Sequence, residues 1–230
     1  FKPEDKGQVA LGLEDNAASA GGPAAPRKEM TGLTYAEARK TPAFWAVCFI
    51  AIALNACTIG IYTQVQAYLT DVGYAAVLAA TVVSIISLCN AFAKMFFGWL
   101  DDKIGTRGNY MVAMAVFLCG LTAMLFVQQG IAVCYVAAVL FGFGLACPSI
   151  ITPMVTMAAL GQKDFAAIYS RVASFFFLGS TIGPIISGVV FDYTGSYRSA
   201  ILFYIALLVI SIVIGTNLLR KKAPEPAKAA

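Results

Sequence analysis

One lysine stands inside a long apolar stretch of the sequence. Lys94 follows an uncharged run from residue 72 to residue 93, and the next charged residue is Asp101. If this stretch is helical, Lys94 lies roughly 10 Å from Asp101 along the helix, at about 1.5 Å per residue. A charge so deep in apolar surroundings is costly and usually serves a function. An ammonium group in this position can neutralise a small carboxylate.

Polar residues accompany Lys94 on the same side of the expected helix. Ser87, Asn90 and Lys94 are three and four residues apart, so they share one helix face. This grouping favours an anion site. The alternative is that the long side chain of Lys94 snorkels towards the lipid headgroups, which would make it structural.

Three further apolar stretches carry polar residues at helical spacing, whereas the remaining two have only Thr122 and Ser211 near their middles. The three stripes are Asn55, Thr58, Tyr62 and Gln66; Ser149, Thr152 and Thr156; and Arg171, Ser174 and Thr181. Four polar-faced helices predict a shared cavity. Its predicted substrate-binding residues are Lys94, Asn90, Asn55, Tyr62, Ser87, Ser149 and Arg171. The alternative is that the hydroxyls bond their own backbone and the asparagines join helices.

The elements that carry these residues must cross a membrane. Of the 230 residues, 60% are hydrophobic and only 12% are charged, about half the charged fraction of a soluble domain. A membrane helix needs about 20 apolar residues. The uncharged runs therefore predict an all-α membrane protein with six transmembrane helices, at residues 44–69, 77–100, 110–127, 131–160, 165–191 and 197–219. A β-barrel would need alternating polarity, which these runs lack.

The flanking segments differ from this bundle in composition. We expect residues 1–43 to form a cytoplasmic loop, with Thr34 and Glu37 as a capping box, and residues 220–230 to form a cytoplasmic tail. The predicted loops on one side hold most of the Lys and Arg residues, and those on the other side hold only Arg198. Because positive loops stay inside, we expect both ends in the cytoplasm, in a bacterial cytoplasmic membrane.

Several chemistries are disfavoured by residue content. The chain has no histidine, which removes histidine-dependent catalysis and metal ligation from this segment. All six cysteines fall inside predicted spans, where they pack as small apolar residues. We therefore expect no enzyme activity, no metal and no cofactor. Nucleic acid is not expected as a partner, because no basic stripe interleaved with aromatic residues is present.

The end of the second predicted helix is repeated at the end of the fifth. Gly98, Asp102 and Gly105 have the same spacing as Gly188, Asp192 and Gly195. Helices three apart in a six-helix chain run in opposite directions, so the repeat predicts a 3+3 inverted repeat.

The segment 98–107 resembles the cytoplasmic signature of the major facilitator superfamily, Gly-x-Leu-x-Asp-Lys/Arg-x-Gly-x-Arg. The matching residues, with one more acid, are Gly98, Asp101, Asp102, Lys103, Gly105 and Arg107. The glycines of the fifth span, at 179, 183 and 188, also resemble that family. The resemblance implies that the six spans are half of a twelve-helix carrier, that residues before about 41 are its central loop, and that segment 98–107 forms a gate. Helix capping and topology signals are the alternative role for this segment.

Two features resemble the oxalate/formate antiporter and monocarboxylate carrier group. They are Thr41-Pro42-Ala43-Phe44-Trp45 and the cation at Lys94. The resemblance implies secondary transport of small organic anions by alternating access, as antiport or proton symport. Oxalate carriers have a second deep cation in the penultimate helix, and the run 172–191 here has none, which favours monocarboxylates. The expected partners are a small carboxylate, the N-terminal six-helix half and the lipid bilayer.

Two rival functions remain open from the sequence. A drug or lipophilic compound exporter of the same superfamily would make Lys94 a structural residue. A non-transporting membrane sensor would bind a ligand without carrying it across the membrane.

Overall fold

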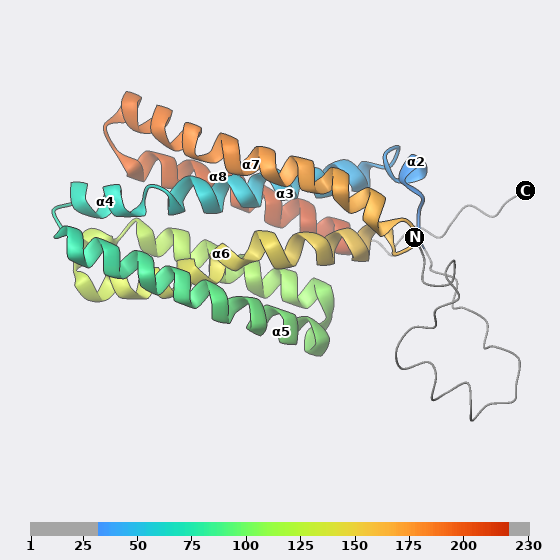
Figure 1. Ribbon diagram of the computed structural model, residues 1–230, viewed down its shortest axis with the longest axis horizontal. Helices are drawn as coiled ribbons and strands as arrows, with labels where there is room; N and C mark the ends of the chain where they lie inside the picture. Colours follow the sequence, from blue (N-terminus) through green and yellow to red (C-terminus); the bar gives the residue numbers. More distant parts are fainter. Residues whose placement is uncertain (1–31, 221–230) are drawn as a thin grey trace, which may run out of the picture.

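Long helices lying side by side make up the described part of the chain, residues 32–220 of a computed structural model (Figure 1). The helices are α2 (Tyr35–Ala38), α3 (Pro42–Tyr62), α4 (Val65–Asp71), α5 (Ala76–Met124), the 3-10 turn η2 (Val127–Gln129), α6 (Ile131–Leu160), α7 (Phe165–Thr194) and α8 (Tyr197–Arg220). The expected loop at residues 1–43 and tail at 220–230 lie mostly outside the described residues.

The described residues form six membrane-crossing segments. Five helices are long and apolar enough to cross a membrane, and one of them, α5, is two helices joined at Gly105. Gly105 has φ 72° and ψ 164°, a conformation that glycine adopts without strain. The chain therefore reverses between residues 76–104 and 106–124 of α5, as Figure 1 shows at one end of the molecule. The prediction of an all-α fold with six spans is confirmed.

The boundaries of several spans differ from the sequence prediction, those of the first most of all. The predicted first span, 44–69, is divided into α3 and α4 at Thr63 and Gln64. The Gln64 N–H donates to the carbonyl of Ile61 at 2.9 Å, and the Thr63 hydroxyl donates to the carbonyl of Ile59 at 2.9 Å. These bonds tighten the last turn and satisfy carbonyls at the helix end. The third span ends at Met124, and η2 follows it.

Glycines allow two close helix–helix contacts, one between α3 and α7 and one between α5 and α6. The inverted repeat relates these two contacts to each other. A Cβ on Gly183 of α7 would lie 2.6 Å from the Ala56 carbonyl of α3, and one on Gly142 of α6 would lie 2.7 Å from the Ile86 carbonyl of α5. In a 3+3 repeat, α3 corresponds to α6, and residues 76–104 of α5 correspond to α7. The two contacts are therefore equivalent, and small residues permit both.

The repeated motif ends in a positive φ in both halves. Gly195 has φ 65° and its N–H donates to the Phe191 carbonyl at 2.7 Å, a left-handed helix cap. Gly105 occupies the corresponding position with φ 72°. The repeat seen in the sequence thus corresponds to a glycine with positive φ at the end of each helix, although ψ differs, at 164° for Gly105 and 15° for Gly195.

The short helix α2 is attached to the connection between α6 and α7. The Leu33 N–H donates to the Leu160 carbonyl at 3.0 Å, and the Tyr35 N–H donates to the Asp164 carboxylate at 2.9 Å. Glu37 accepts bonds of 2.8 Å from the N–H and hydroxyl of Thr34, as predicted, and these bonds hold the pKa of Glu37 below its ordinary value. The Thr41 hydroxyl then accepts from the Phe44 N–H at 3.3 Å and caps α3.

Candidate functional site

A cavity of about 410 Å³ opens between four helices. Its polar lining comes from α3, the first part of α5, α6 and α7: Asn55, Thr58, Tyr62, Ser87, Asn90, Lys94, Ser149 and Ser180. Its apolar lining is Ile59, Leu145, Pro148, Phe176 and Phe177. These are the four helices that the polar stripes indicate, and the second part of α5 and α8 contribute none of these residues.

The cavity brings together six of the seven residues that we predicted as substrate-binding. Arg171 is the exception, because it lines a different pocket with Tyr35, and its guanidinium lies 5.7 Å from the centre of that ring. Ser180 takes its place on α7. Arg171 and Ser180 are nine residues apart, about two and a half helical turns, so they lie on opposite sides of α7.

The close contact between α3 and α7 explains why the sequence pointed to the wrong face of α7. Residues spaced three or four from Arg171 form a polar stripe, but the glycines at 179 and 183 face α3. That contact turns Phe176 and Ser180 towards the cavity. The glycines were the available signal, since small residues mark the side of a membrane helix that packs.

Hydrogen bonds within the cavity connect its walls. The Asn55 side-chain amide donates to the Phe176 carbonyl at 2.7 Å and links α3 to α7. The Tyr62 and Ser87 hydroxyls are 3.0 Å apart and link α3 to α5. Asn55 was expected to donate to a ligand, but this bond uses one of its two amide protons.

Most hydroxyls of the cavity bond the backbone of their own helix. Thr58, Ser87 and Ser149 donate to the carbonyls of residues 54, 83 and 146 at 3.0 Å each. The alternative that these hydroxyls bond their own backbone is therefore correct, as far as the hydroxyl protons are concerned. Their oxygen lone pairs remain able to accept a bond from a ligand. Asn90 Oδ1 is also an acceptor, buried and without a hydrogen-bond partner in the structure.

Lys94 gives the cavity its charge. The side chain is exposed in the described structure, and no carboxylate is among the described residues that line the cavity. The ammonium group thus has no acidic neighbour in the lining. A positive charge in a cavity of low polarity attracts a small anion.

The predicted gate residues lie around the reversal in α5. Asp101 accepts bonds from the Thr106 hydroxyl at 3.4 Å and from the Asn109 amide at 3.3 Å. Asp102, Lys103 and Arg107 are exposed. A Cβ on Gly98 would meet no described atom within 4 Å. The turn is therefore stabilised on its inner side by the bonds to Asp101, while its other charged residues lie on the outer, exposed side.

Asn109 was missed by sequence reasoning. It is fully buried, and its amide also donates to the Phe97 carbonyl at 3.0 Å and approaches Met154 Sδ at 3.6 Å. Asn109 therefore joins both parts of α5 to α6. The only signal in the sequence was a polar residue shortly after the motif, at the start of an apolar run.

The cysteines in the described part of the chain are all free thiols, and four of the six are buried. Among the described residues, no cluster of three or more Cys, Asp, Glu or His side chains that could hold a metal ion is found. The chemistry of the site thus rests on Lys94 and the neutral polar groups around it.

Comparison with known proteins identifies the family. The sequence profile of the Major Facilitator Superfamily matches residues 9–163 and, in a second alignment, residues 48–230. The chain belongs to this superfamily, as its fold and signature motif indicate, and is an integral, multi-pass membrane protein.

Curated relatives are distant and longer. An uncharacterized MFS-type transporter, C18.02 of Schizosaccharomyces pombe, is 28% identical over 58% of this chain and 30% of its own length. The uncharacterized MFS-type transporter YhjX of Escherichia coli is 26% identical over 66% of the chain and 37% of its own. Mouse monocarboxylate transporter 9 is 28% identical over 65% of the chain and 31% of its own. The chain thus spans about a third of these proteins.

A solved structure shares the fold. The crystal structure of an auto-inhibited POT family peptide transporter superposes with a TM-score of 0.61 at 14% identity. The match covers 80% of this chain and 39% of that chain. At this identity the match supports the helical architecture alone.

Proposed function

We propose that this chain is the C-terminal half of a secondary transporter for small organic anions, with monocarboxylates as the substrates. The observation that carries the proposal is the position of Lys94 in a cavity formed by four helices, with no carboxylate among its described lining residues. Lys94 neutralises the substrate carboxylate, and the polar groups of α3, α5 and α6 surround it. The similarity to mouse monocarboxylate transporter 9 supports this substrate class.

The position of Arg171 supports a single carboxylate as the ligand. Arg171 lines another pocket, so Lys94 is the only cation among the described lining residues of the cavity. A dicarboxylate would leave its second charge without a partner on this side, which is costly in a medium of low dielectric constant. The hydroxyl oxygens and Asn90 Oδ1 offer acceptors that suit a substrate bearing a hydroxyl group.

The two inverted repeats support alternating access as the mechanism. In this mechanism the six spans move as one half, and the opposite half completes the cavity and rocks against it. The charged residues of segment 98–107 lock the gate on one side. We also propose that exchange, or an acidic group in the opposite half, provides the coupling, because the described spans place no carboxylate in the cavity lining.

Uptake into proteoliposomes tests the role of Lys94. The full-length protein carrying Lys94→Gln should lose uptake of labelled lactate, pyruvate or acetate by roughly tenfold or more, since a hydrogen bond to a charged group contributes about 1.5–3 kcal/mol. Lys94→Arg should retain part of the uptake. Lys163→Gln, which removes the same charge from the exposed connection before α7, should transport normally. Unchanged monocarboxylate uptake by Lys94→Gln would refute the site.

Export of lipophilic compounds is the second candidate, and the aromatic wall of Phe176 and Phe177 favours it. In that case a lipophilic dye would be expelled equally well by the wild type and by Lys94→Gln. Anion uptake would be absent from both.

A further inference from the structure

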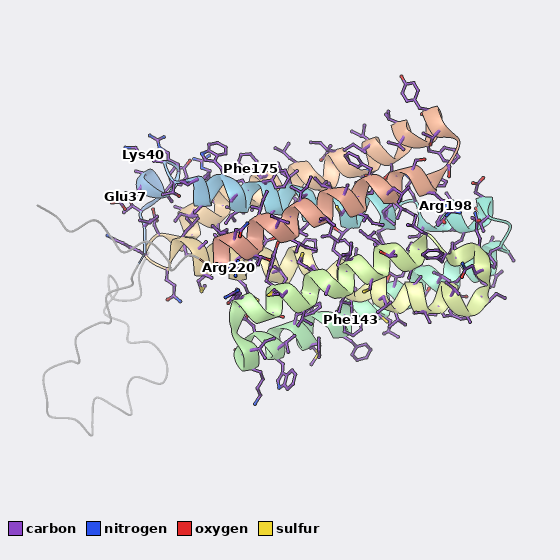
Figure 2. The ribbon with its side chains drawn as sticks, turned by 180° about the vertical axis from the view of Figure 1, so that it is seen from behind. Glu37, Lys40, Phe143, Phe175, Arg198 and Arg220 are labelled. Carbon is purple, nitrogen blue, oxygen red and sulfur yellow. The ribbon has the colours of Figure 1, made fainter. Side chains whose placement is uncertain are left out.

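A second cavity, of about 500 Å³, lies at the end of the bundle that carries α2. Its lining combines three cations, Arg39, Lys40 and Arg171, with an aromatic wall of Tyr35, Phe44, Trp45 and Phe175 and the hydroxyl of Ser174. No acid is among the described residues that line it. Figure 2 shows Lys40 and Phe175 together at this end of the molecule, and Arg198 at the opposite end.

This pocket is separate from the substrate cavity. No residue lines both pockets, and on α7 Arg171 lies on the side opposite to Ser180, which lines the substrate cavity. The two sites therefore cannot be occupied by one small ligand.

The pocket is held in place by contacts on each of its walls. Its α2 wall is fixed by the Tyr35 N–H bond to Asp164, and the Trp45 indole N–H donates to the Arg39 carbonyl at 3.2 Å. The Trp45 and Phe175 rings meet edge to face with centres 6.1 Å apart. The segments that carry the cations are thus tied to the rest of the bundle.

The sequence around the pocket changes from charged to uncharged, the pattern typical of the end of a membrane span. Arg39 and Lys40 directly precede the uncharged run 41–70, and Arg171 directly precedes the uncharged run 172–191. Phe175 is one helical turn deeper than Arg171, about 6 Å. Trp45 is 57% exposed, in the position that tryptophan favours at a membrane interface.

We infer that this pocket binds the phosphate headgroup of an anionic phospholipid. The three cations surround the phosphate, and an acyl chain runs inward along Trp45 and Phe175. Basic pockets between membrane helices bind lipid headgroups in this way. A free phosphate ion would satisfy the cations but would leave the exposed side chain of Trp45 and the half-buried ring of Phe175 without a partner, so the lipid is the better occupant.

Lipid binding to the purified full-length protein in neutral detergent tests the inference. Native mass spectrometry would count bound phosphatidylglycerol, with phosphatidylcholine as the neutral comparison. Arg171→Gln should weaken phosphatidylglycerol binding roughly fivefold, the effect of one interfacial cation. The double variant Arg39→Gln with Lys40→Gln should weaken it further. Trp45→Ala should reduce lipid affinity by removing the acyl contact.

Two controls make the outcome decisive. Arg220→Gln removes an exposed charge outside the pocket and should bind lipid as the wild type does. Arg171→Lys should restore most of the binding, which separates loss of charge from loss of fold. Equal weakening by Arg171→Gln and Arg220→Gln would mean general surface attraction and would overturn the inference. Displacement of the lipid by millimolar inorganic phosphate would also overturn it, in favour of a free-anion site.

Discussion

Asn109 shows how a single neutral side chain can hold a charged segment in position. Its amide bonds the Phe97 carbonyl and the Asp101 carboxylate from the far side of the Gly105 turn. Asp101 is therefore fixed by neutral donors, while the neighbouring charges of the signature stay exposed. The exposed charges of segment 98–107 thus extend from a fixed turn, which limits the entropy that they would lose on pairing with another group.

Asn109→Ala should destabilise the protein by about 1–3 kcal/mol, because buried acceptors lose their donor. Thermal unfolding in detergent would show a lower midpoint. Asn217→Ala, at an exposed position of α8, is the matched control and should unfold like the wild type. Equal midpoints for the two variants would contradict the role given to Asn109.

Some residues of the site could be predicted from the sequence and others could not, and the difference has a physical reason. Lys94, Asn90 and Ser87 could be assigned to one face from spacing alone, because they belong to one helix. Ser180 could not be assigned, because its direction depends on how α7 packs on α3. Asn109 could not be recognised either, since its partners come from two separated parts of the chain, the segment 97–101 and Met154.

At the level of elements, glycines set the distance between α3 and α7. The Gly183 position has no room for a side chain, whereas a Cβ on Gly188, five residues further along α7, would meet no described atom within 4 Å. The sequence shows both glycines in one helix without distinguishing them. Only the packed structure shows that Gly183 contacts α3 and that Gly188 has free space beside it.

Gly183→Ala should cost about 1–3 kcal/mol of stability, the usual effect of overpacking. Gly188→Ala should be neutral or stabilising by up to about 1 kcal/mol, since alanine favours a helix over glycine. Thermal melting of the two variants side by side provides the measurement. The assignment fails if Gly188→Ala is the more damaging of the two.

Helix number and most helix limits followed from the sequence. The prediction for 131–160 matches α6, because hydrophobic length is decided locally. The division between α3 and α4 was missed, since it depends on a single tight turn at Thr63 and Gln64. The reversal at Gly105 was expected as a longer loop, although one positive φ is enough to make it.

At the level of the whole molecule, charge is distributed unequally between the two ends. Lys40 and Arg220 lie towards one end and Arg198 lies at the other (Figure 2). The positive-inside rule places the first end in the cytoplasm. This orientation is a prediction that labelling can check.

Cysteine labelling in a background with the native cysteines replaced would test the orientation. Tyr193→Cys, at a site 87% exposed near the Arg198 end, should react with a membrane-impermeant maleimide in intact cells. Gln162→Cys, in the exposed connection before α7, should react only after permeabilisation. The reverse pattern would place the Lys40 end outside.

The attachment of α2 has a mechanical consequence. The hydrogen bonds of Leu33 to Leu160 and of Tyr35 to Asp164 lie ahead of α3 along the chain. A force applied to the polypeptide before Leu33 is therefore borne in part by the junction of α6 and α7. Such a force is shared between α3, which follows α2 in the chain, and the connection between α6 and α7.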